Sequence, residues 1–182
     1  MIINERNIRH EEVLQIAKQI MIAARTAPKG KGLDIVEIGM VTGEEIYKLS
    51  VEMKAIAEEK GLKFFLRDAE NILNAEAVLL IGTKAQTQGL NCAHCGFCTC
   101  LEKPESVPCV INVIDVGIAI GSACSKAADL RVDTRVMFSA GLAAQHLNIL
   151  NDDTCKCVFA IPISASSKNP FFDRKKKEQE TK

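Results

Sequence analysis

Five of the eight cysteines in this 182-residue chain lie within residues 92–109, and no other feature of the sequence constrains the protein so strongly. Disulfides are rare in reducing compartments, so a dense cluster of thiols more often indicates metal or redox chemistry. The surrounding residues 83–109 contain two glycines and two prolines and show little hydrophobic periodicity. We therefore predict an inserted, irregular loop over 83–109 that something other than a hydrophobic core organises.

The spacing of these thiols is typical of an iron–sulfur cluster, for which a [4Fe-4S] centre is our first expectation. A Cys-x2-Cys turn presents two thiolates to one point, and a cluster usually takes four thiolates. Five candidates therefore compete for four places. One ligand set is Cys92, Cys95, Cys100 and Cys109. The other set takes Cys98 as the third ligand, but it lacks the Cys-x3-Cys-Pro continuation of bacterial ferredoxins.

Zinc is the alternative metal for the same loop. Zinc sites with four cysteine ligands commonly use two Cys-x2-Cys pairs that lie apart in the sequence. Here only Cys92 and Cys95 form a clear pair, and the other thiols crowd the same segment. Free or redox-active thiols without a metal are a third alternative. A second pair, Cys155 and Cys157, would lie on one face of a regular strand and could bind a metal or another thiol.

The rest of the chain alternates helix and strand patterns, which predicts one α/β (α+β) domain over residues 1–182 with a helix-covered sheet. Helices are expected over 11–25, 43–60, 110–128 and 139–148, and strands over 33–41, 77–82, 134–138 and 157–163. Residues 64–75 suggest a short strand and a helical turn. Thr42 and Glu45 form a capping-box pattern before the second helix. The charged tail 173–182 is expected to be flexible.

The helix expected over 110–128 is the most apolar segment, and we expect it to be buried. Gly117, Gly121 and Ser125 recur every four residues and leave one bare face on which a neighbour can approach closely. Two ambiguous charged pairs remain, because Arg67-Asp68 and Asp133 with Arg135 could each be a buried ion pair or part of a site.

Charge and composition exclude several function classes. The chain carries 23 basic and 23 acidic residues, so its formal charge is zero, and it has no Trp and one Tyr. A nucleic-acid binder needs a basic excess or stacking aromatics, so we expect no nucleic-acid partner. No apolar run approaches the ~20 residues of a bilayer span, so we expect no membrane association. With no apolar leader pattern at the N-terminus, a cytoplasmic protein is expected.

Several segments together resemble a prokaryotic family of uncharacterised proteins that contain a ferredoxin domain. The motifs that carry the resemblance are residues 24–32 (ARTAPKGKG), 67–69 (RDA), 89–100 (GLNCAHCGFCTC) and 115–123 (DVGIAIGSA). The resemblance implies an iron–sulfur loop. This chain departs from the pattern at Ala93, where a glycine is usual, and at the additional Cys98. The fourth ligand of related loops would fall near Gly117, which cannot bind metal, and Cys109 is our substitute.

The order of elements also resembles the nitroreductase fold, more distantly. That resemblance implies a homodimer that binds FMN at its interface and holds the phosphate with basic residues near both ends of the chain. The corresponding candidates here are Arg6, Arg9, Lys168 and Arg174. Arginine suits this role because its planar fork matches phosphate geometry. The same residues could instead be solvated surface charge, and the Pro-Lys-Gly-Lys-Gly turn at 28–32 could be a basic turn without a ligand.

Taken together, these features predict an iron–sulfur redox protein, either an oxidoreductase or an electron-transfer protein, with a [4Fe-4S] cluster and FMN as a further cofactor. An electron-donor protein is an expected partner. The sequence leaves open whether the chain is an enzyme, and it shows no catalytic residue. The alternative is a non-enzymatic interaction or sensor module in which iron–sulfur or zinc holds the loop.

Overall fold

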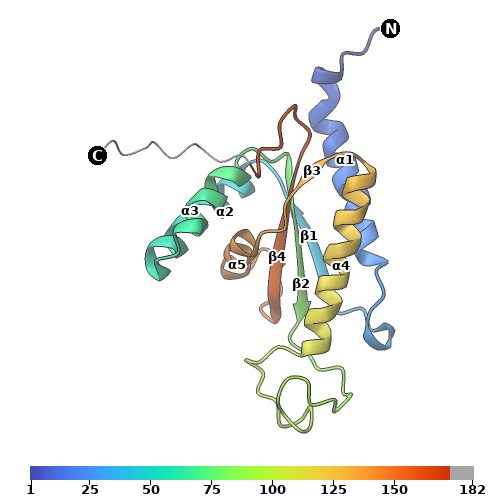
Figure 1. Cartoon of the computed structure of the whole chain (residues 1–182), viewed down its shortest axis with the longest axis vertical. Coiled ribbons are helices and arrows are strands. Elements are labelled where there is room, and N and C mark those ends of the chain that lie inside the picture. The colour runs from blue at the N-terminus through green and yellow to red at the C-terminus, as the bar shows by residue number, and fades with distance from the viewer. Residues whose placement is uncertain (173–182) are drawn as a thin grey trace, which may run out of the picture.

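The computed structural model describes residues 1–172; the predicted flexible tail 173–182 and Arg174 lie outside the described residues. Five helices and one 3-10 turn alternate with four strands (Figure 1). The elements are α1 (Glu5–Arg25), the turn η1 (Gly30–Gly32), β1 (Val36–Val41), α2 (Glu44–Lys60), α3 (Lys63–Ile72), β2 (Ala77–Lys84), α4 (Val110–Asp129), β3 (Asp133–Thr134), α5 (Phe138–His146) and β4 (Cys155–Ser164).

The strands form a single antiparallel sheet in the order β1-β2-β4-β3. The central strand β2 is the apolar run AVLLIGTK, in which every residue but the last is buried. A strand with helices on both faces needs apolar side chains on both, which explains why β2 shows no alternation in sequence. Leu80 of β2 pairs with Gly39 of β1 and with Ala160 of β4, which fixes the register at the centre of the sheet.

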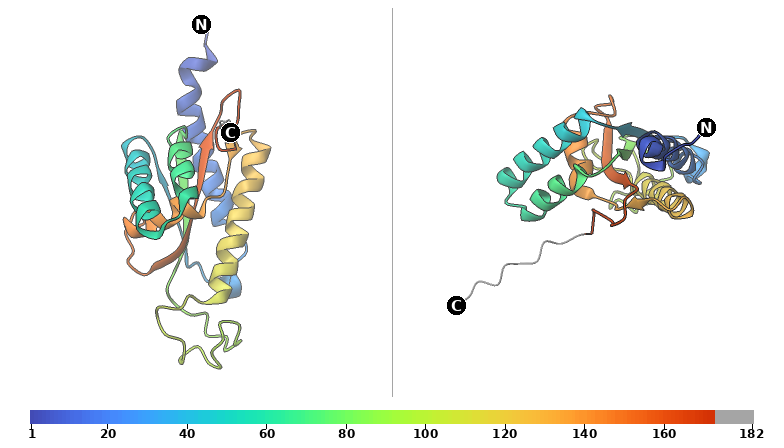
Figure 2. Two further views of the ribbon diagram at one scale, coloured as in Figure 1. Left: turned by 60° about the vertical axis from the view of Figure 1, so that its left-hand side comes forward. Right: turned by 90° about the horizontal axis from the view of Figure 1, so that it is seen from above.

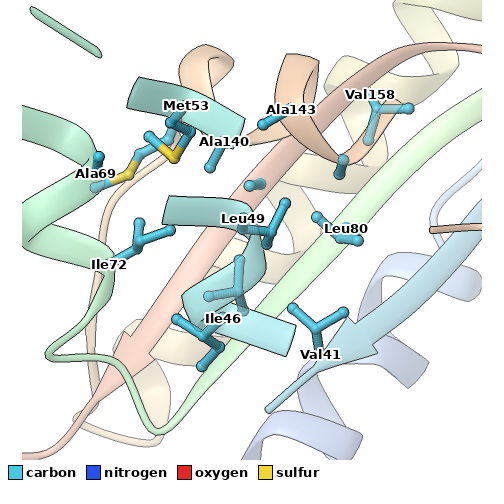
Figure 3. Close-up of a cluster of buried hydrophobic side chains, with 14 of the residues drawn as sticks. Val41, Ile46, Leu49, Met53, Ala69, Ile72, Leu80, Ala140, Ala143 and Val158 are labelled. Atoms are coloured by element: carbon cyan, nitrogen blue, oxygen red, sulfur yellow. The ribbon is translucent and has the colours of Figure 1, made fainter. Parts of the chain in front are cut away.

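The helices divide between the two faces of the sheet (Figures 1 and 2). Val78 and Leu80 join a cluster with side chains of α2, α3 and α5, which we call the α2/α3/α5 face. Figure 3 shows this cluster. Leu79 and Ile81 point the other way, into a cluster with α1 and α4, which we call the α1/α4 face. Because side chains alternate between the two faces along β2, this one strand contributes residues to both hydrophobic clusters.

Several predicted elements are corrected by the structure. Residues 64–75 were expected to hold a short strand and a helical turn, but most of them belong to the helix α3, whose amphipathic pattern buries Phe65, Asp68 and Ile72 on one side. The predicted capping box is absent, because the N-cap of α2 is Gly43, with φ 53°, and no side chain caps it. Residue Gly61, in contrast, ends α2 in the left-handed conformation that its position predicted.

The entry to β4 also departs from a regular strand. The register with β2 shifts between Ile81 and Thr83, and Cys157 adopts φ 53° at this bulge. A bulge interrupts the alternation of side chains, so the expectation that Cys155 and Cys157 share one face of a regular strand does not hold. Cys155 is buried in the cluster of the α2/α3/α5 face, whereas Cys157 is only partly buried.

Helix α4 is amphipathic rather than buried throughout. Its inner side packs Val116, Ala119 and Ala123 into the α1/α4 face. Its outer side exposes Ile114 and Ile118, and a Cβ added at Gly117 or Gly121 would meet nothing within 4 Å. Contrary to our sequence expectation, this 20-residue helix is long and apolar enough to cross a membrane. Length and composition alone are weak grounds for a membrane span, since the core helix of a water-soluble protein passes the same test.

Candidate metal centre

The cysteine loop connects β2 to α4 and projects from one end of the sheet, opposite the end where α1 begins (Figure 1). Neither hydrophobic cluster includes a residue between positions 82 and 108. Leu101 and Leu90 are exposed, so the loop has no apolar core of its own. The segment is irregular, as predicted, whereas its organisation by a bound group stays a prediction.

The backbone of the loop coils tightly around the first cysteines. Gly89, Asn91, Ala93 and Gly96 all have φ between 46° and 88°. Left-handed residues turn successive N–H groups toward one side, as in the concave backbone sites that bind anions and iron–sulfur clusters. Ala93, where a glycine was expected, adopts this conformation despite its Cβ, which makes it a strained position.

Asn91 ties the start of the loop to Cys100. Its Oδ1 accepts a hydrogen bond of 2.8 Å from the Cys100 N–H, and its own N–H donates to Cys100 Sγ at 3.4 Å. An N–H group directed at a sulfur is the type of contact that tunes a cluster potential. The same contact closes the loop on Cys100, whereas Cys98 is exposed.

The five thiols of the loop are free and differ in accessibility. Cys92, Cys95 and Cys100 are partly buried, and Cys98 is exposed. Cys109 is 8% exposed at the N-cap of α4. Within residues 1–172, no three side chains of His, Cys, Asp or Glu lie close enough together to hold a metal ion. The loop therefore supplies suitable sulfur donors, and the thiols would have to converge to bind a cluster.

The base of the loop is closed by buried polar side chains, of which the sequence motifs had included only Asp115, in the segment 115–123. Gln88 enters the loop, and Asn112 and Asp115 follow it on the first turns of α4. Asp115 accepts the Gly30 N–H at 3.0 and 3.1 Å on its two oxygens. A Cβ at Gly30 would lie 2.8 Å from Ile111 Cγ2, so this approach requires glycine. Asn112 and Asp115 are polar residues inside the apolar segment VINVIDVG, and this interruption was the sequence signal for the site.

The two lysines of the basic turn are satisfied within the chain. Lys29 Nζ donates to the carbonyls of Arg25 at 2.5 Å and Ala27 at 3.0 Å, at the C-terminus of α1. A cation there complements the helix dipole. Lys31 Nζ donates to the Gln88 carbonyl at 3.0 Å. The turn thus joins α1 to the base of the cysteine loop, which favours the basic-turn alternative over a phosphate site.

The two candidate phosphate ligands of α1 lie far from the loop. Arg6 and Arg9 belong to the first turns of α1, at the opposite end of the sheet (Figure 1). Both donors of the Arg9 fork are engaged by the Glu5 carboxylate. Lys168 is exposed in the segment after β4, and Arg174 lies outside the described residues. A pocket of about 190 Å³ beside α1, lined in part by His10, Tyr47 and Glu76, is smaller than the ~300–1,000 Å³ of typical cofactor sites.

Three of the four residues in the two ambiguous charged pairs form one structural network on the α2/α3/α5 face. Asp68 accepts hydrogen bonds from Arg67 at 2.7 Å and from the Ser139 hydroxyl at 2.7 Å. Arg135 lies 3.8 Å from the same carboxylate and donates to the Phe171 carbonyl at 2.8 Å. The network fastens the segment after β4 to α3, and no ion pair of Asp133 occurs among the described residues.

Three cysteines outside the loop have pKa values above the usual value of a thiol. Burial raises the pKa of Cys155 to about 11, and the carboxylates of Asp152 and Glu37 add to this effect. Burial also raises the pKa values of Cys124 and Cys157. The thiolate is the nucleophile and the metal ligand, so these three cysteines are poor candidates for reactive or ligating positions.

Comparison with solved structures identifies the fold. A nitroreductase with bound FMN from Bacteroides fragilis superposes with a TM-score of 0.59 and 13% identity, over 92% of this chain and 84% of that one. A nitroreductase with bound FMN from Desulfitobacterium hafniense gives a TM-score of 0.58 and 15% identity, over 94% and 87%. The predicted nitroreductase-like fold, with a cysteine-rich loop inserted, is therefore confirmed.

Comparison of sequences identifies the family. A family model described as "Uncharacterized protein containing a ferredoxin domain (DUF2148)" matches residues 105–174, a segment that begins after Cys100 and includes Cys109. An uncharacterized protein of Archaeoglobus fulgidus is 44% identical over 96% of this chain and 98% of its own length. The chain accordingly belongs to the family of proteins described as containing a ferredoxin domain.

Proposed function

We propose that the protein is an iron–sulfur redox protein whose cluster lies in the cysteine loop. The observation that carries the proposal is a segment with five thiols that contributes nothing to either hydrophobic cluster and coils through four left-handed residues. An inorganic centre would supply the organisation that the loop lacks. The family description, which includes a ferredoxin domain, supports the same chemistry. The bound cluster would supply one-electron transfer.

Cys92, Cys95, Cys100 and Cys109 are our ligand set for a [4Fe-4S] cluster. The Asn91 contacts favour Cys100 over Cys98, because they draw the Cys100 sulfur toward the start of the loop near Cys92. The exposed Cys98 has no such contact among residues 1–172. Cys109 would complete the set from the N-terminus of α4.

The test is anaerobic purification followed by iron and sulfide analysis and a visible spectrum. The wild-type protein should contain about four iron atoms and show a broad band near ~400 nm. Cys100→Ser should abolish this band, whereas Cys98→Ser should retain it. Zinc in place of iron, in a colourless protein, would contradict the proposal and favour the structural-metal alternative, in which the loop serves as an interaction or sensor module.

A second cofactor, FMN, and a homodimer form the second half of the proposal. The fold neighbours carry bound FMN, and this chain places Arg6 and Arg9 at the end of the sheet away from the cysteine loop. One chain alone therefore does not bring a flavin phosphate site beside the cluster. An antiparallel pair of α4 helices would do so, because it sets the α1 start of one copy beside the loop of the other.

The outer side of α4 suits such a pairing. Ile114 and Ile118 are exposed there, and the open glycines between them allow close helix approach. Added FMN should raise the melting temperature of the dimer by mass action. Ile118→Lys should convert the dimer to a monomer in light-scattering measurements and abolish the FMN shift. A wild-type monomer would contradict the dimer, and an FMN-independent melting temperature would favour an electron relay with no flavin.

A further inference from the structure

Both ends of the cysteine loop are fastened together by one buried polar cluster. Gln88 Nε2 donates to Asn112 Oδ1 at 3.0 Å and reaches Asp115 Oδ2 at 3.5 Å. Asn112 Nδ2 in turn donates to the Gln86 carbonyl at 2.5 Å. Gln86 and Gln88 lie at the start of the loop, and Asn112 and Asp115 follow its end, so these contacts close the loop at its base.

The contacts fix the orientation of both side-chain amides. The Gln86 carbonyl requires Asn112 to present its Nδ2, which leaves Asn112 Oδ1 to accept from Gln88. Turning the Gln88 amide over would place its oxygen against Asn112 Oδ1 and the Asp115 carboxylate. Gln88 Nε2 therefore faces the cluster, and Gln88 Oε1 faces away from it.

This cluster is incompletely satisfied, unlike the other buried polar side chains of residues 1–172. Gln88 Oε1 is buried and has no hydrogen-bond partner among the described residues. Asp115 is 3% exposed, and no Arg, Lys or His of residues 1–172 forms an ion pair with it. An unsatisfied buried polar group lowers stability, so its presence calls for an explanation other than stability.

Cys109 adjoins the cluster in sequence, at the N-cap of α4. It precedes Asn112 by one helical turn, and its carbonyl accepts the Val113 N–H at 3.1 Å as the helix begins. Its thiol is buried, whereas the other thiols of the loop are partly or fully accessible. A ligand at this position must leave its buried site before it can reach the centre of the loop.

We propose that Gln88, Asn112 and Asp115 are positioning residues that form a polar clamp at the base of the cysteine loop, and that the Cys109 thiol becomes accessible only when the clamp opens. The role of Cys109 as a metal ligand rests on the proposed function, but the clamp and the protection of Cys109 do not. Opening breaks the two Gln88 contacts and frees the first turn of α4, a local transition rather than global unfolding.

The test is alkylation of the metal-free, reduced full-length chain with iodoacetamide, with the rate at each cysteine followed by mass spectrometry. Asp115→Asn should speed alkylation of Cys109 about tenfold, because the clamp opens more often. Cys92 should react at an unchanged rate, since it is already accessible. Cys155 should also be unchanged, because it lies in the other hydrophobic cluster.

Asp68→Asn is the matched control, because it makes the same change at an equally buried aspartate on the opposite face. It should leave the Cys109 rate at the wild-type value even if it lowers the melting temperature more. Gln88→Leu serves as a second variant if Asp115→Asn fails to fold, and the same selective gain at Cys109 is expected. An unchanged Cys109 rate in a folded clamp variant would overturn the proposal.

Equal rates at Cys109 and Cys98 in the wild-type protein would overturn it as well. The outcome is separate from that of the proposed function, since iron content is measured on other material. A wild-type chain without iron that still shows clamp-dependent protection of Cys109 would remove the cluster and keep the clamp. A chain that binds iron, but in which the clamp variants leave the Cys109 alkylation rate unchanged, would keep the cluster and remove the clamp.

Discussion

Two aspartates are almost equally buried on opposite faces of the sheet, and their surroundings differ completely. Asp68, 4% exposed, is held by Arg67, Arg135 and Ser139 on the α2/α3/α5 face. Asp115, 3% exposed, has neutral donors only, beside the unpaired Gln88 oxygen. Burial of a charge therefore does not by itself mark a functional site. The hydrogen-bond and ion-pair partners of the buried group do. A network that stabilises the fold satisfies its polar groups, whereas a binding or catalytic site leaves some polar groups without a protein partner.

The largest expected effect is at Asp68, the aspartate whose carboxylate has cationic partners. Asp68→Asn removes the charge that two guanidinium groups share, so we expect the free energy of unfolding to fall by about 3 kcal/mol. This is the low end for buried pairs, because both arginines reach solvent. Urea denaturation measures it. A loss no larger than that of Asp115→Asn would mean that the two aspartates are energetically equivalent.

The second prediction concerns pH and the thiol buried on the same face. Cys155 has its pKa raised from 9.0 to about 11 in the folded protein, so its contribution is fully present below pH 9.0 and is lost as the pH rises through 11. The unfolded chain releases the proton first, which lowers stability by about 2 kcal/mol over that window. Denaturation at pH 8 and pH 11 measures this, and Cys155→Ala should reduce the difference by that amount.

The third prediction concerns Asp115, the aspartate that has no cationic partner among residues 1–172. Asp115→Asn keeps the shape of the side chain and removes a charge that has no cationic partner, so we expect a loss of only about 1 kcal/mol. Urea denaturation beside Asp68→Asn gives the comparison directly. A loss above that of Asp68→Asn would show that Asp115 is a structural group of the first importance, and the contrast between the faces would fail.

The smallest expected effect lies on the outer side of α4. Ile118 is 40% exposed in the single chain, so Ile118→Ala should change the free energy of unfolding of the monomer by less than about 0.5 kcal/mol. Measurements over a range of protein concentrations separate this from assembly. If the proposed dimer forms, the variant should lose stability only at the concentrations at which wild type is dimeric.

Local patterns were sufficient for much of the fold. The apolar run of β2, the left-handed stop at Gly61 and the long helix after the cysteines appeared where the sequence placed them, because each depends on residues adjacent in the chain. The helix α3 was missed although Phe65, Ala69 and Ile72 recur at helical spacing, and the structure shows that these residues pack in one cluster with side chains of α2 and β2.

Long-range contacts decided what sequence patterns could not. The bulge at Cys157 arises from pairing with β2, and the Asp68 network joins residues from α3, the approach to α5 and the segment after β4. The clamp joins Gln88 to Asp115 across the whole cysteine loop. Each of these contacts spans more residues than any local rule of spacing covers.

The amino-acid sequence by itself determined that thiols gather in one irregular segment between an inner strand and an apolar helix, because thiol spacing and hydrophobic period are local properties. Only the tertiary structure decided which thiols are accessible, which aspartate has cationic partners and at which end of the sheet each candidate ligand lies. These are properties of neighbours in space, and folding brings such neighbours together from distant parts of the chain.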